Sequence, residues 1–269
     1  MTTVRRLTNY FTPKHYQLSL TINRVARTFT GTVTINGIAN NSGSIWLHTK
    51  DLTITDCVAN GKAVDFKLGE NDELEIKAEL TSSEAAVITL GFTGAITDQM
   101  HGMYPCYFKH AGEAKELIAT QFESHHAREV FPCIDEPEAK ASFDVTLTTE
   151  KGITVLGNMP VKVQTEENNN LVTTFETTPR MSTYLLAWVL GDMHRKTATT
   201  KGGVEVNVWA TAAQSPESLD FALDIATRTI DFFDDYFGTP YPLPKSDHVA
   251  LPDFSSGAME NWGLITYRE

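Results

Sequence analysis

The chain has 269 residues, of which 41% are hydrophobic and 21% charged, as is typical of a folded globular protein. Its 34 acidic and 22 basic residues give a formal net charge of −12. Nucleic acid and anionic membranes are therefore disfavoured as partners, because phosphate binding needs a basic surface.

The sequence contains few features that indicate cellular location or cysteine pairing. The N-terminus lacks the apolar region of a secretory signal, and no later segment approaches the length of a membrane span. The three cysteines, Cys57, Cys106 and Cys133, are too widely spaced to indicate a disulfide framework or a metal-binding pair. We expect buried or free thiols in a cytoplasmic protein.

Short strands separated by turns are predicted from residue 15 to about residue 190. His15–Ile22 and Thr28–Ile35 alternate in polarity, and Asn60-Gly61 after the strand Leu52–Val58 is the favoured pair for a tight hairpin. With no long helix between them, these strands predict a mainly β domain over residues 1–190, an antiparallel sandwich or saddle. Further strands are predicted at Glu73–Lys77, Ala86–Phe92, Met103–Phe108, Ser142–Thr148, Leu171–Glu176 and Thr183–Leu190.

A second, α/β domain is predicted to start at residue 191. After a strand at Val204–Ala210, Ser215-Pro216 has the pattern of a helix N-terminus, and Gly238 followed by Pro240 ends the helix. A strand at His248–Leu251 follows. An apolar stripe marks the buried face of the helix, and its aspartates read as the solvated face. The stripe is Leu219, Ala222, Leu223, Ala226, Ile230, Phe233 and Phe237, and the aspartates are Asp231, Asp234 and Asp235.

Two motifs carry the residues best suited to chemistry. The first runs from Thr120 to Pro137 and reads TQFESHHAREVFPCIDEP, and the second, GAMENWG, runs from Gly257 to Gly263. Glycine allows a ligand to lie against the main chain. A lone carboxylate at Glu260 is followed by the amide of Asn261. Such a loop favours ligand binding over packing alone.

Both motifs closely resemble those of the zinc aminopeptidases of the aminopeptidase N / puromycin-sensitive type (gluzincins). The match continues through Lys140–Leu147 and Asn158-Met159-Pro160, so that it covers essentially the whole chain. The resemblance implies an antiparallel β-sandwich or saddle followed by the incomplete start of an α/β, thermolysin-like catalytic domain. It also implies an enzyme that releases N-terminal residues from peptides.

The resemblance assigns a substrate-binding role to each candidate residue. Gln121 and Glu123 would form the pocket for the first residue of a peptide, and Glu123 and Glu260 would bind its α-amino group. Gly257 and Ala258 would offer backbone groups, Met259 would wall the first side-chain pocket, and Asn261 would brace the loop. The chemistry is sound in itself, because a protonated α-amine distinguishes a chain terminus from an internal amide.

The family's zinc helix, His-Glu-x-x-His, is absent from this sequence, so no catalytic or metal-binding residue is assigned. Zinc is expected in the intact enzyme, with none bound to this chain, which we expect to be inactive alone. We also expect self-association through its second domain and a protease-resistant core near residues 1–190.

Plainer interpretations stay open. Glu123 and Glu260 could be ordinary solvated acids and Met259 core filling. His125 and His126 are expected to lie in an extended segment, on opposite faces, as a polar rim. Arg128 is expected to pair with Asp135. The alternatives for the whole protein are a non-catalytic binding scaffold and an epoxide-opening relative, which Ala258 disfavours.

Overall fold

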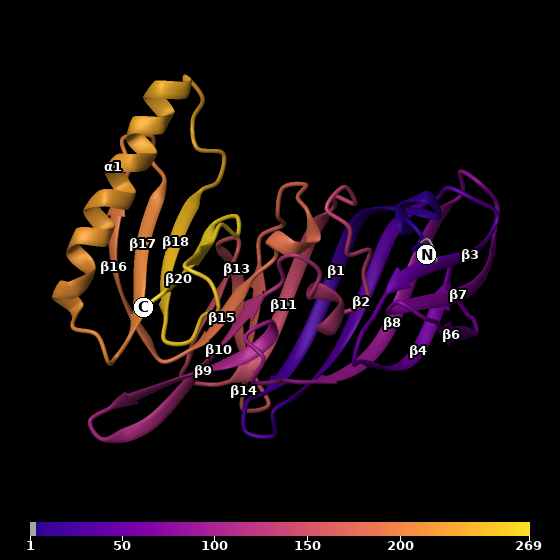
Figure 1. The fold of residues 1–269 in the computed structure, drawn as a ribbon, viewed down its shortest axis with the longest axis horizontal. Helices are drawn as coiled ribbons and strands as arrows, with labels where there is room; N and C mark the ends of the chain where they lie inside the picture. The colour runs from indigo at the N-terminus through magenta and orange to yellow at the C-terminus, as the bar shows by residue number, and fades with distance from the viewer. Residues whose placement is uncertain (1–3) are drawn as a thin grey trace.

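In the computed structural model, which describes residues 4–269, β-strands form four sheets and one long helix lies at one end of the molecule (Figure 1). Residues 1–3 of the N-terminal stretch considered above lie outside the described part. The predicted mainly β fold is confirmed.

The largest sheet has eight strands and forms the body of the N-terminal part. Its centre is β1 (Phe11–Asn23), which pairs antiparallel with β2 (Thr28–Ala39) and parallel with β11 (Ser142–Glu150). The sheet is therefore not purely antiparallel. In order, it contains β13 (Val161–Glu167), β14 (Asn170–Phe175), β11, β1, β2, β8 (Ala85–Ala95), β4 (Thr53–Ala59) and β5 (Lys62–Ala63).

Two smaller sheets complete this part. A three-stranded sheet contains β3 (Gly43–His48), β7 (Glu73–Leu80) and β6 (Phe66–Leu68). A four-stranded sheet contains, in order, β12 (Thr154–Gly157), β15 (Trp188–Gly191), β10 (Glu113–Gln121) and β9 (Gly102–His110). The expected hairpin at Asn60-Gly61 is present, with both residues at positive φ between β4 and β5.

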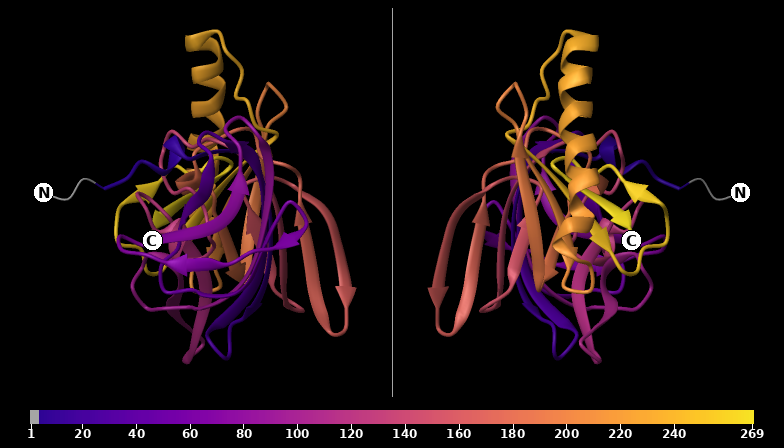
Figure 2. Two further views of the ribbon diagram at one scale, coloured as in Figure 1. Left: turned by 90° about the vertical axis from the view of Figure 1, so that its right-hand side faces the viewer. Right: turned by 90° about the vertical axis from the view of Figure 1, so that its left-hand side faces the viewer.

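The C-terminal part is a five-stranded sheet covered on one face by the helix α1 (Asp220–Phe237) (Figure 2). Its order is β16 (Met193–Thr199), β17 (Glu205–Thr211), β18 (Lys245–Leu251), β20 (Leu264–Arg268) and β19 (Ala258–Met259), and β17, β18 and β20 run parallel. A short 3₁₀ turn, Pro216–Leu219, precedes α1, and Gly238 ends it in the left-handed conformation, as predicted.

One hydrophobic core joins the two parts. It contains Phe122, Phe131 and Trp188 from the N-terminal part together with Leu251 and Met259 from the C-terminal sheet. The boundary at residue 190 stays a prediction. Among the described residues, no helix has both the length and the apolar character to cross a bilayer.

Two predictions of local structure were wrong. Thr183–Leu190 is not one strand: Thr183–Leu185 is a 3₁₀ turn, and only Trp188 onward enters β15. Asp231 and Asp234 are not simply solvated, because they accept hydrogen bonds from the backbone N–H groups of Lys201 (2.8 Å) and Tyr241 (2.7 Å). These aspartates fix the turn between β16 and β17 and the segment that follows α1.

Several strands escaped prediction. β13 is exposed along its whole length, so it has no apolar alternation to read. β10 combines a polar first half with a buried second half, and β12 has only four residues. The remaining unpredicted strands are β3, β5, β6, β16, β19 and β20.

Candidate peptide-recognition site

The first motif begins at the end of β10, where its side chains change from buried to exposed. Phe122 is fully buried and packs edge-on against Trp188 and Phe131, with ring centroids 5.4 and 6.2 Å apart. Glu123, the next residue, is exposed. Gln121 is 7% exposed, and its Oε1 has no hydrogen-bond partner among the described residues. The buried aromatic ring thus anchors a segment that presents a carboxylate and an unsatisfied amide.

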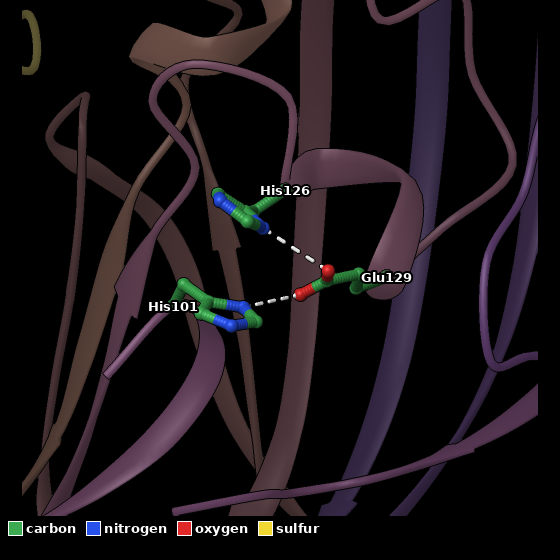
Figure 3. A group of neighbouring side chains, drawn as sticks. All are labelled: His101, His126 and Glu129. Atoms are coloured by element: carbon green, nitrogen blue, oxygen red, sulfur yellow. Dashed lines mark hydrogen bonds and ion pairs between the residues drawn. The ribbon is translucent and has the colours of Figure 1, made fainter. Parts of the chain in front are cut away.

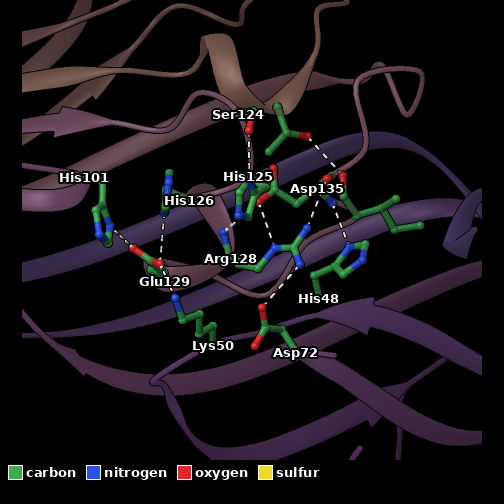
Figure 4. A network of polar contacts seen from close by, with 12 residues as sticks. His48, Lys50, Asp72, His101, Ser124, His125, His126, Arg128, Glu129 and Asp135 are labelled. Carbon is green, nitrogen blue, oxygen red and sulfur yellow. Dashed lines mark hydrogen bonds and ion pairs between the residues drawn. The ribbon is translucent and has the colours of Figure 1, made fainter. Parts of the chain in front are cut away.

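A charged network fixes the chain that follows (Figure 4). Arg128 Nε lies 3.2 Å from Asp135 Oδ2, which confirms the expected pair, and Arg128 Nη1 lies 3.4 Å from Asp72. The backbone N–H of Asp135 donates to His48 Nδ1 at 3.1 Å. Burial, and then the charges of Arg128 and His125, lower the pKa of His48 to about 3, so its ring is a neutral acceptor.

The histidine pair in this motif is arranged differently from the prediction. His125 and His126 lie in a turn, and their rings stack with centroids 4.7 Å apart. The extended segment with opposed side chains was therefore wrong. The cause is local: the N–H of His126 bonds to the carbonyl of Phe122 at 2.9 Å, which closes the turn.

The second motif forms the edge of the C-terminal sheet. Ala258–Met259 is β19, the outermost strand, and it pairs antiparallel with Tyr267 and Thr266 of β20. Gly257 and Ala258 are exposed, and a Cβ at Gly257 would meet nothing within 4 Å. The carbonyl of Gly257 accepts the N–H of Arg268 at 3.0 Å. A sheet edge offers unpaired backbone groups to an extended peptide.

The side chains of this loop alternate in burial. Met259 is 1% exposed and belongs to the hydrophobic core, which is the packing role considered above. Glu260 is exposed. Asn261 is 1% exposed and its Nδ2 has no acceptor among residues 4–269, so no side-chain bracing by this amide is observed. Its backbone carbonyl closes a turn with the N–H of Leu264.

Asn158 provides the bracing instead. Its Nδ2 donates to the carbonyl oxygens of Trp262 and Leu185, both at 2.8 Å, and its Oδ1 accepts the N–H of Ala187 at 2.8 Å. Gly263 packs so closely here that a Cβ would lie 2.2 Å from the Asn158 carbonyl oxygen, and its φ is +72°. Glycine is therefore required at the end of the loop.

A buried lysine holds the same end. Lys245 Nζ donates to the carbonyls of Gly157 (2.9 Å) and Gly263 (2.7 Å) and to Asp247 Oδ2 (2.7 Å). Its side chain is 9% exposed and that of Asp247 3%. Burial lowers the pKa of Lys245, and the Asp247 charge opposes the shift. Lys245 and Asn158 together form what we call the loop clamp.

The start of the loop is fixed on the far edge of the four-stranded sheet. Asp253 Oδ2 accepts the N–H of Tyr107 at 2.6 Å, and its backbone carbonyl accepts from Tyr104 Oη (3.2 Å) and Cys106 Sγ (3.3 Å). Tyr104, Cys106 and Tyr107 belong to β9, whereas the loop clamp acts at β12. The loop therefore reaches from one edge of this sheet to the other.

Strand register brings the two motifs together. Leu156, Val189, Ala119 and Tyr104 form one row across the sheet. Because β12 and β10 run in the same direction, Asn158 and Gln121 leave the sheet at the same end, two strands or about 10 Å apart. Asn158 bonds directly to the second motif at Trp262. The unpaired amides of Gln121 and Asn261 consequently belong to one region.

Sequence reasoning assigned no role to Lys245 or Asp253, and it used Asn158 only as part of a matching motif. Lys245 lies before the predicted strand His248–Leu251, next to Ser246 and Asp247, so nothing in the local pattern marks it as buried. Asn158 lies 104 residues from its loop partner, and no local pattern reveals such a contact.

Comparison with known families identifies the family of this chain. The Peptidase M1 N-terminal domain matches residues 12–185, and the Peptidase family M1 domain matches residues 221–269. The chain belongs to the peptidase M1 family. The resemblance to aminopeptidase N inferred from the two motifs is thereby confirmed.

Relatives within the M1 family are similar over almost the whole chain. A protein named aminopeptidase N from Lactococcus lactis subsp. lactis is 53% identical over 274 residues, and one from Lactobacillus helveticus is 45% identical over 269, each covering 99% of this chain. Aminopeptidase M1 of Arabidopsis thaliana is 39% identical over 277 residues, covering 98%. The chain spans 31% of the length of each of these relatives.

Residues 4–269 do not supply the zinc-binding helix that the family resemblance implies. α1 is the one α-helix within residues 4–269, and it contains no histidine. Imidazole and carboxylate ligands one helical turn apart are therefore missing from this part of the protein.

Proposed function

We propose that this chain is the substrate-reading part of an M1 aminopeptidase, in which the two motifs bind the free N-terminus of a peptide. The observation that carries the proposal is a pair of buried amides, Gln121 and Asn261, with unpaired atoms at the same end of one sheet. Buried polar groups are almost always hydrogen-bonded. A bound peptide group would satisfy both.

Charge supplies the selectivity for a terminus. Glu123 follows Gln121 after one buried residue, and Glu260 precedes Asn261, so each amide has an exposed carboxylate beside it. An α-ammonium group would donate hydrogen bonds to both carboxylates. Such charge-assisted hydrogen bonds are about twice as strong as neutral ones. An internal peptide bond or an acetylated terminus carries no such charge.

Backbone pairing supplies the direction. β19 is an edge strand, with Gly257 and Ala258 exposed beside it. A peptide added along this edge would start at the carboxylates of Glu123 and Glu260 and extend along β19. Its main chain would be held independently of its sequence. The roles of Gly257, Ala258 and Met259 in binding remain part of the proposal.

The intact protein would then be a zinc-dependent aminopeptidase in the cytoplasm. The relatives are named aminopeptidases, and three buried free cysteines fit a reducing compartment. This chain alone would bind without cleaving. Release of leucine from a chromogenic amide by residues 1–269, abolished by EDTA, would contradict that expectation. A downstream sequence in which the metal ligands are replaced would favour the binding-scaffold alternative.

The test is a titration of this chain with a short peptide, followed by NMR or calorimetry, in its free and N-acetylated forms. The free peptide is expected to bind at least about tenfold more tightly, because acetylation removes the charge that both carboxylates read. Equal affinity of the two forms would overturn the proposal.

A matched control comes from the same strand. Glu113 lies at the opposite end of β10 from Gln121 and is exposed like Glu123. Glu113→Gln should leave the affinity unchanged, whereas Glu123→Gln should abolish the preference for the free amine. A similar loss from both substitutions would mean that general charge, and no specific site, attracts the peptide.

A further inference from the structure

Three side chains from separate segments converge on the carboxylate of Glu129: the two histidines appear in Figure 3 and Lys50 in Figure 4. His101 Nδ1 lies 2.7 Å from Oε2, and His126 Nδ1 lies 3.0 Å from Oε1. Lys50 Nζ lies 2.9 Å from Oε1. His101 precedes β9, His126 and Glu129 belong to the turn after β10, and Lys50 follows β3.

The rings of His101 and His126 lie close together and are partly exposed to solvent. Their rings stack with centroids 4.0 Å apart and planes inclined by 27°. The side chains of His101, His126 and Glu129 are 27%, 20% and 11% exposed. One nitrogen from each ring and one carboxylate oxygen all lie within 4.8 Å of one another, and residues 4–269 contain no second group of three such ligands.

We propose that His101, His126 and Glu129 bind a divalent transition-metal ion of the zinc type. Two imidazoles and one carboxylate are a ligand set that such ions accept, with metal–ligand distances of about 2.0–2.2 Å. The ion would take the place of the protons that now join each ring to the carboxylate. Water would fill the open coordination position, as in other sites with three protein ligands.

Lys50 fits this arrangement as a support for the carboxylate. Burial would raise the pKa of Glu129, but its hydrogen bonds with His126, Lys50 and His101 outweigh burial and lower it. Lys50 can keep its bond to Oε1 while the ion takes Oε2, because ligating carboxylates are commonly held by hydrogen bonds from outside.

The ligand set differs from the helical pair of ligands that the M1 resemblance implies. It is built from a loop and a turn in the N-terminal part, with no helical pair of ligands. Its position gives the ion a consequence: His126 lies three residues after Glu123, so the ion would tie the turn of the first motif to the loop before β9. Binding to the folded state alone stabilises that state by mass action.

The experiment titrates this chain with Zn²⁺ by calorimetry and repeats thermal unfolding at a hundredfold excess of Zn²⁺ over Kd. One ion per chain and a rise in Tm of about 5–10 °C are expected. His101→Ala and His126→Ala should each weaken binding at least about tenfold, since even second-shell changes cost that much. His110→Ala, at the far end of β9, is the control and should change nothing.

Two results would overturn the proposal: no heat of binding and an unchanged Tm with the wild-type chain, or full binding retained in the His101→Ala/His126→Ala double variant. Should a variant fail to fold, Co²⁺ added to the wild-type chain gives a second reading. Visible absorption at one equivalent, displaced by Zn²⁺ but not by Mg²⁺, would support nitrogen ligation, and its absence would refute it.

Discussion

The two motifs are held in place in different ways. The first, from Thr120 to Pro137, is fixed by charged and titratable groups, including the Arg128–Asp135 pair and the neutral ring of His48. The second, from Gly257 to Gly263, is fixed by hydrogen bonds from the loop clamp to backbone carbonyls. The supports of the first motif include titratable groups, so their strength depends on pH. The supports of the second motif are hydrogen bonds to backbone carbonyls, so their strength depends on how the sheets pack together.

The two motifs therefore depend on different parts of the molecule. The first motif gains its stability within the N-terminal part, because its partners lie on β3 and in the neighbouring loops. The second depends on contacts across the sheets, with partners at Gly157 and Asn158. The stability of the second loop is therefore tied to the joining of the two parts.

The largest effect is expected from protonation of His48. Its folded pKa of about 3 lies below the unfolded value of 6.5, so the unfolded state binds the proton first as the pH falls. The stabilisation is fully present above pH 6.5 and is lost progressively towards pH 3, by up to about 5 kcal/mol at 1.36 kcal/mol per pH unit. Urea unfolding between pH 7 and 4 measures this slope.

His48→Asn isolates the contribution of the ring. Asparagine keeps an oxygen that can accept the Asp135 N–H but does not titrate, so the pH slope should become shallower than in the wild type. Identical slopes in the two proteins would mean that other groups carry the acid sensitivity of the first motif.

Removal of the Lys245 ammonium should be the next largest effect. Lys245→Met leaves Asp247 buried without its partner and two carbonyls unsatisfied, which should lower the free energy of unfolding by about 3–5 kcal/mol. Lys196→Met is the control, since Lys196 pairs with the largely exposed Asp220 and should contribute less than about 1 kcal/mol. Comparable losses from both changes, in chemical denaturation, would contradict the role of the loop clamp.

Asn158→Ala should destabilise the protein by about 1–3 kcal/mol, because three buried hydrogen bonds lose one partner. Amide hydrogen exchange should accelerate around Trp262 and Gly263 while β1 and β2 stay protected. Uniform acceleration across the protein would show that Asn158 supports the whole fold and not the second loop in particular.

The smallest change in stability is expected on α1. Phe233 and Phe237 are 45% and 66% exposed, so the stripe predicted to be the buried face is covered only in part. Phe233→Ser/Phe237→Ser should change unfolding by about 0.5 kcal/mol or less. It should also reduce the concentration-dependent association predicted for this part, measured by light scattering. Unchanged association would remove α1 from the proposed contact.

The sequence predicted most of what is local. Alternation located β1 and β2, the Asn60-Gly61 pair located its hairpin, and Ser215-Pro216 and Gly238 bounded the helix region. These features depend on neighbouring residues. The uniformly exposed β13 and the turn at Thr183–Leu185 were missed, because tertiary contacts, including the bond from Asn158 to Leu185, decide their conformation.

The candidate site was predictable in composition but not in construction. The motifs pointed to Gln121, Glu123 and the loop from Gly257, and the expected Arg128–Asp135 pair is present. The supports at Lys245 and Asp253, and the convergence of His101 on Glu129, include pairs of residues 18 to 149 positions apart in sequence. Only the fold brings such pairs together.

The central claim is that Glu123 and Glu260 bind one and the same ammonium group. A double-mutant cycle tests it directly: peptide affinity is measured for the wild type, Glu123→Gln, Glu260→Gln and the double variant. A shared ligand predicts a coupling of at least about 0.5 kcal/mol, with the double variant losing less than the sum of the single losses. Strictly additive losses, or no loss from either substitution, would contradict a single recognition site.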